Sequence, residues 1–124
     1  MQTYSEYLRE IKGGIMVYRN KGHFTLDVEC LQKVVDYILK QPQNKDIRID
    51  IEKSPNEYSK SLYLRFYIGD DTTALRISDH ECKGDIRQII VGESTGIANV
   101  CYKIESAIHA LRFKRLRGLL DRGL

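Results

Sequence analysis

The chain has 124 residues, of which 42% are hydrophobic and 30% charged, with a net charge of +3. That length suits one domain with a single core that needs no staples, and the composition is that of an ordinary globular protein, which excludes a low-complexity chain. No apolar run is long enough to cross a bilayer, and the small net charge does not by itself indicate nucleic-acid binding. The chain does not open on a charged segment followed by an apolar one, so we expect no secretion signal.

Residues 1–24 are expected to form an N-terminal helix and a short strand. Thr3 and Glu6 have the spacing of a capping box, in which each side chain bonds the other's backbone amide. The residues that share one helical face are Tyr4, Tyr7, Leu8 and Ile11. Gly13 should end this helix, and residues 15–19 should form the strand.

Residues 25–111 are expected to hold the core. A second helix should begin with Thr25 as its cap and end before Pro42, because the residue before proline avoids the helical region. Its apolar stripe consists of Val28, Leu31, Val35 and Ile38. Isoleucines and charged residues then alternate over residues 47–52, which predicts a half-buried strand.

A hairpin is predicted over residues 61–80. Apolar residues alternate with tyrosines and an arginine over 61–68, Gly69 and two aspartates favour a turn, and residues 74–80 return as a second strand. The apolar phase of the first strand is Leu62, Leu64, Phe66 and Ile68, and its polar phase is Tyr63, Arg65 and Tyr67.

A short strand at residues 86–91 and a long final helix complete the core. Ser94 or Thr95 should cap the helix, whose core stripe is Val100, Ile104, Ala107, Ile108 and Leu111. The element order predicts an α+β fold: an antiparallel sheet of three to four strands with helices packed on one face. We expect buried positions at Ile49, Leu64, Phe66 and Ile104.

Residues 112–124 form a basic helical tail that departs from the core stripe. Its cations are Arg112, Lys114, Arg115, Arg117 and Arg122. A second apolar stripe, made of Phe113, Leu116 and Leu120, begins on another side of the helix. Because a solvated helix end gains nothing from such a stripe, we expect a homo-oligomer, most simply a dimer, through these three residues.

Two groups of residues are candidates for function. The first is a binding surface for an anionic partner, in which Tyr63, Arg65, Tyr67 and Arg76 combine with Arg112, Lys114 and Arg115 of the tail. Tyrosine faces stack on bases and also anchor protein interfaces. A sheet whose tyrosines simply pack under another element is an equally weighted alternative.

The second candidate is the loop that follows the hairpin, with Ser78, Asp79 and His80. A metal site needs three or four converging ligands, whereas His23 and His109 lie in distant segments, so we expect no metal and no cofactor. A polar loop stabilised by its own side chains is favoured. A metal-dependent nuclease or hydrolase using Asp79 and His80 is the alternative.

The cysteines indicate a reducing compartment. Cys30, Cys82 and Cys101 are odd in number, widely spaced and without a Cys-x-x-Cys pair. We therefore expect free thiols and a cytoplasmic location.

The hairpin resembles a pattern found in small uncharacterised proteins of phages and other mobile elements. The matching residues are Ser59-x-Ser61-x-Tyr63 and the run from Leu75 to His80, Leu-Arg-Ile-Ser-Asp-His. The resemblance implies a non-enzymatic, anti-CRISPR-like inhibitor in a host cytoplasm that acts on a defence nucleoprotein or on nucleic acid. The element order is also similar to that of double-stranded RNA-binding domains, but residues 93–96 replace the lysine cluster of that family.

Overall fold

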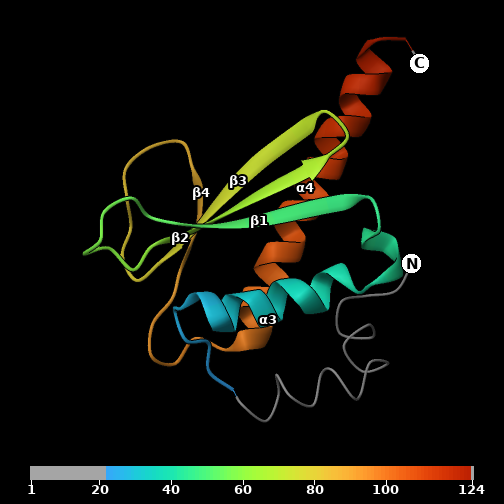
Figure 1. Cartoon of the computed structure of the whole chain (residues 1–124). Coiled ribbons are helices and arrows are strands. Elements are labelled where there is room, and N and C mark those ends of the chain that lie inside the picture. Colours follow the sequence, from blue (N-terminus) through green and yellow to red (C-terminus); the bar gives the residue numbers. More distant parts are fainter. Residues whose placement is uncertain (1–21, 124) are drawn as a thin grey trace.

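The structure is a computed structural model that describes residues 22–123. The helix predicted from Thr3 and the strand predicted at residues 15–19 lie outside the described residues. The elements, in chain order, are helix α3 (Val28–Leu39), the 3-10 turn η1 (Pro42–Asn44), strands β1 (Ile47–Lys53), β2 (Leu62–Ile68), β3 (Asp71–Ser78) and β4 (Arg87–Ile90), and helix α4 (Ile97–Asp121) (Figure 1).

The four strands form one mixed sheet in the order β1-β2-β3-β4. β1, β2 and β3 are antiparallel neighbours, as predicted, with Ile49 opposite Phe66 and Tyr63 opposite Arg76. β4 instead runs parallel to β3, so the fully antiparallel sheet of the prediction is wrong at this strand. The two strands are parallel because the connection at residues 79–86 leads the chain back from the end of β3 to the level of Leu75, where β4 begins. The predicted α+β class is confirmed.

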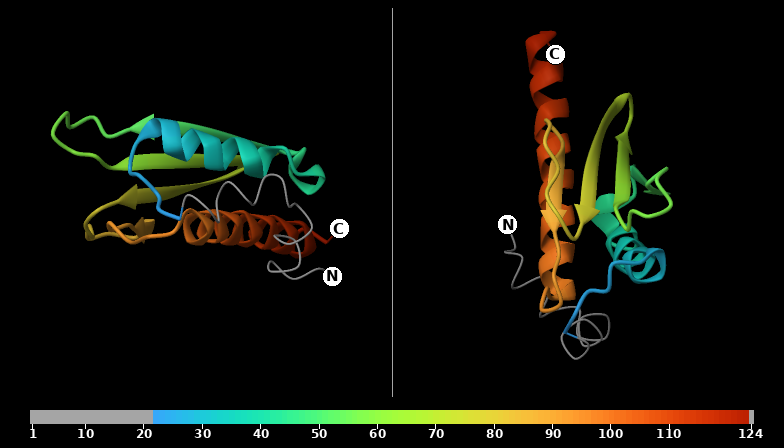
Figure 2. Two further views of the ribbon diagram at one scale, coloured as in Figure 1. Left: turned by 90° about the horizontal axis from the view of Figure 1, so that it is seen from below. Right: turned by 90° about the vertical axis from the view of Figure 1, so that its left-hand side faces the viewer.

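Both helices cover the same face of the sheet, α3 over β1 and α4 over β2 and β3 (Figures 1 and 2). This face carries the apolar phase of every strand because side chains alternate between the two faces. Leu64, Phe66 and Ile104 are fully buried and Ile49 is nearly so, which confirms the predicted core positions. The buried cluster includes residues from both helices and all four strands.

The helix starts differ from those predicted. Asp27, and not Thr25, caps α3, because its Oδ1 accepts a 2.7 Å hydrogen bond from the Cys30 amide. α4 begins after Gly96, and the hydroxyl of Thr95 accepts a bond from the Gly92 amide within the preceding turn. Several neighbouring short polar residues could each cap the start of these helices, and the sequence alone does not show which of them does.

The last turns of α4 extend past the sheet (Figure 1). Here Phe113, Leu116 and Leu120 are 62%, 52% and 59% exposed. Within residues 22–123, no helix combines the length and apolar character needed to span a membrane.

Candidate functional site

The polar face of the sheet, opposite the helices, is formed by alternate residues of β1 and β2. They are Arg48, Asp50, Glu52, Tyr63, Arg65 and Tyr67, a set that we call the open face. Arg65 Nε lies 3.0 Å from Glu52 Oε1, and Arg48 Nη2 lies 3.2 Å from Asp50 Oδ2. The Arg48 guanidinium also stands 4.1 Å above the Tyr67 ring. The two arginines are therefore neutralised by neighbouring carboxylates, and the open face is balanced in charge.

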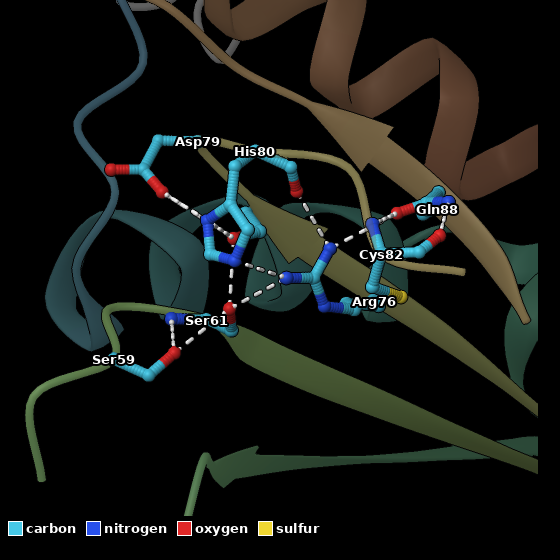
Figure 3. Close-up of polar contacts among 8 residues, drawn as sticks. Ser59, Ser61, Arg76, Asp79, His80, Cys82 and Gln88 are labelled. Carbon is cyan, nitrogen blue, oxygen red and sulfur yellow. Dashed lines mark hydrogen bonds and ion pairs between the residues drawn. The ribbon is translucent and has the colours of Figure 1, made fainter. Parts of the chain in front are cut away.

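Arg76 belongs to the same strand phase but is only 3% exposed. Its Nη1 donates to the His80 carbonyl (2.8 Å) and to Gln88 Oε1 (3.0 Å), and its Nη2 donates to Ser61 Oγ (3.1 Å) (Figure 3). Arg76, which the sequence places in the binding surface for an anionic partner, is instead covered by the loop at residues 79–86, and its guanidinium is held by acceptors within the chain. None of the ion pairs within residues 22–123 involves Arg76.

His80 connects the buried cation to a surface carboxylate. Its Nε2 lies 3.1 Å from Arg76 Nη2, and its Nδ1 lies 2.8 Å from Asp79 Oδ1. A guanidinium can only donate, so Nε2 accepts, and the ring proton sits on Nδ1 and points to Asp79. This hydrogen bond holds the pKa of Asp79 below its usual range. Asp79 thus balances the Arg76 charge through the imidazole.

Three serines extend this network along the end of the hairpin. Ser61 Oγ accepts from Ser59 Oγ (3.0 Å) as well as from Arg76, which uses both of its lone pairs. Its own hydrogen must therefore go to Ser78 Oγ, 2.8 Å away across the strands. Ser59, Ser61 and Gln88 are site residues that the sequence patterns did not predict. The signal for Ser61 was present, because it shares the strand phase of Tyr63 and faces Ser78 in the hairpin register.

A shallow cleft of about 370 Å³ opens beside this network. It is lined by Asn56, Tyr58, Ser59, Lys60, Asp79 and His80, and we call it the Tyr58 cleft. Asn56 Oδ1 accepts a 3.0 Å bond from the Tyr58 amide, which shapes the loop. The Tyr58 side chain is 88% exposed. The loop thus presents an aromatic ring to solvent, and the His80 imidazole lines the same cleft.

The hydrolase alternative depends on Asp79 and His80, whose side chains are 56% and 61% exposed. Both ring nitrogens of His80 have hydrogen-bond partners, so His80 would have to give up its contact with Arg76 or with Asp79 before it could exchange a proton with a substrate. No group of three or more His, Cys, Asp or Glu side chains in the described part of the chain could hold a metal ion.

The arginines of the tail make structural contacts. Arg112 forms a two-pronged pair with Asp46 (2.7 and 2.9 Å), which lowers the pKa of that carboxyl. Arg115 bonds Asp71 (2.8 Å) and the Ile68 carbonyl. α4 lies on the apolar side of the sheet and the open face on the other, so the prediction that tail and tyrosines form one surface is wrong. Lys114 is exposed and has no ion pair among residues 22–123.

Comparison of the chain with protein-family models, with curated proteins and with solved structures gives no match. The resemblance to phage and mobile-element proteins stays a prediction.

Proposed function

We propose that this chain is a non-enzymatic binding protein that engages a protein of a host defence complex through the open face and the Tyr58 cleft. In the setting that the hairpin resemblance implies, it would be an anti-defence factor of a phage or mobile element, acting in the host cytoplasm. The observation that carries the proposal is the exposed Tyr58 ring, held beside His80 on a hydrogen-bonded base.

The charges favour a protein partner over bare nucleic acid. Binding to nucleic acid depends on cations that can replace the counterions of the phosphates. On the open face, Arg48 and Arg65 already have carboxylate partners, and Arg76 is buried. Aromatic rings surrounded by balanced charges are typical of protein interfaces, in which tyrosine and arginine supply much of the binding energy.

The Arg76 network supports this surface from beneath. It joins the ends of β2 and β3 through Ser61 and Ser78. It also holds the loop at residues 79–86, which we call the crossover loop, through the His80 carbonyl and Gln88. Gln88 also bonds both the amide and the carbonyl of Cys82. A surface fixed in this way loses little conformational entropy on binding.

The test begins with capture from an extract of the host, using immobilised wild-type chain, Tyr58→Ala and the control Gln32→Ala. Gln32 is an exposed residue of α3, away from the open face. We expect a protein that is retained by wild type and by the control but lost with Tyr58→Ala. In a binding assay with that purified protein, Tyr58→Ala should weaken the affinity at least tenfold.

Salt dependence separates the two classes of partner. A nucleic-acid ligand held by six or more phosphate contacts loses about a thousandfold in affinity between 50 and 200 mM salt. We expect less than a tenfold loss for a protein ligand. Equal retention by all three chains would refute the surface assignment, and a steep salt slope with ligand that nuclease treatment removes would refute the protein partner.

A further inference from the structure

A second surface lies on the side of α4 that faces away from the core. Its residues recur at alternating intervals of four and three: Tyr102, Ser106, His109, Phe113, Leu116 and Leu120. We call this set the seam. Such spacing is that of the apolar a and d positions of a coiled coil, which places every member on one stripe of the helix. The core-facing residues Val100, Ile104, Ala107 and Leu111 fall between them and are buried.

The seam is most apolar where α4 projects past the sheet. Phe113, Leu116 and Leu120 are each more than half exposed there. Ser106, nearer the middle of the helix, donates its hydroxyl to the Tyr102 carbonyl at 3.0 Å, so its polar group is satisfied within the helix. Three large apolar side chains in one exposed row mark an interaction site.

The cations beside the seam indicate which partner fits. Lys103 and Arg117 flank it on one side, and Lys114 lies close by. All three are exposed, and none has an ion pair among residues 22–123. Phe113, Lys114 and Arg117 also line a groove of about 680 Å³ beside the helix, together with the cation Arg122 and two carboxylates, Asp71 and Asp121. Acidic side chains of a docked helix would meet these cations at the flanking positions.

Pairing with a second copy is disfavoured by the same charges. In an antiparallel pair along the whole seam, Lys103 faces Arg117 of the second copy. In a parallel pair, Arg112 faces Arg117. Like charges at these positions oppose association. The seam thus attracts an acidic helix more strongly than it attracts itself.

We propose that the seam, with its apolar end where α4 projects past the sheet, docks an amphipathic helix of another protein, one with an apolar stripe flanked by Asp or Glu. This site is separate from the open face and does not depend on the function proposed for it. The dimer predicted from the sequence, through Phe113, Leu116 and Leu120, is the alternative, in which a second copy of the chain occupies the seam.

The test uses the full chain and two synthetic helical peptides of three heptads with leucine at every a and d position. One peptide carries glutamate at the flanking positions and the other carries lysine. In fluorescence anisotropy, we expect the acidic peptide to bind at least tenfold more tightly than the basic one. Lys103→Glu combined with Arg117→Glu should reverse this preference. Leu116→Gln should abolish binding, and Tyr58→Ala should leave it unchanged.

Circular dichroism of each variant confirms that the fold is retained. Equal affinity for the two peptides, or no binding of the acidic peptide, would overturn the proposal. Sedimentation equilibrium provides the remaining comparison. A wild-type dimer that Leu116→Gln converts to a monomer at the same concentration would assign the seam to a second copy and would also overturn it.

Discussion

Glu105 of α4 carries a carboxylate that is largely buried, which disfavours its charged form. Its Oε1 is inaccessible to solvent and has no hydrogen-bond partner among residues 22–123, and burial raises the pKa of the side chain to about 7 from an ordinary 4.5. The folded chain therefore holds this proton more tightly than the unfolded chain does. Replacing Glu105 with glutamine removes the ionisation and keeps the shape.

The pKa fixes both the direction and the pH window of the effect. Below about pH 4.5 the group is protonated in both states and the associated stability is fully present. As pH rises to about 7, the unfolded chain loses the proton first, and the stability associated with the protonated form is lost. At about 1.4 kcal/mol per pH unit the upper bound is roughly 3 kcal/mol. The carboxyl is partly open to solvent, so screening reduces the expected loss to about 1–2 kcal/mol.

The assay is urea denaturation of wild type and Glu105→Gln at pH values from 4 to 8. We expect the wild-type free energy of unfolding to fall, relative to the variant, between pH 4.5 and 7 and to level off above. Glu93→Gln, at an exposed carboxylate, is the control and should follow wild type. Parallel curves for wild type and Glu105→Gln would refute the reasoning, whatever the constant offset between them.

Two further predictions concern stability. Phe66 is fully buried at the centre of the sheet, so Phe66→Ala should cost about 3–5 kcal/mol in urea denaturation, and a loss under 1 kcal/mol would contradict the assigned core. Gly69→Ala should lower the melting temperature by several degrees, because φ is +57° and the added Cβ would lie 2.5 Å from Arg115 Nη1. Gly92→Ala, with open space around it, is the matched control, and an equal change in both variants would refute the strain at Gly69.

The antiparallel strands β1 to β3 and their buried residues could be predicted, because the alternation of apolar and polar residues within each strand is a strong local signal. In β2, Leu64 and Phe66 alternate with Tyr63 and Arg65, and this pattern alone assigns each side chain to a face. The direction of β4 could not be predicted in the same way. Ile89 and its neighbours form a run without alternation, and a short polar loop can either reverse the chain or return it parallel. That choice depends on packing over Arg76, a long-range contact.

The candidate site was only partly accessible from the sequence for a related reason. The grouping of Ser78, Asp79 and His80 was visible as a motif, and the structure does bring them together with Arg76. Burial of Arg76 was not visible, since an arginine in the polar phase of a strand is usually solvated. Its acceptors come from three segments, and only the folded crossover loop assembles them.

The distribution of charge links the core to both proposed surfaces. In the sequence, the closely spaced basic residues of the tail resemble a phosphate-binding patch. Arg112 and Arg115 instead bind Asp46 and Asp71 and hold α4 against the η1–β1 and β2–β3 turns. Each pair removes one cation from the surface and leaves the projecting end of the helix with Lys114, Arg117 and Arg122, beside one carboxylate, Asp121. Positive charge therefore remains beside the seam, while the open face is balanced, and this asymmetry is why we assign the two surfaces to different partners.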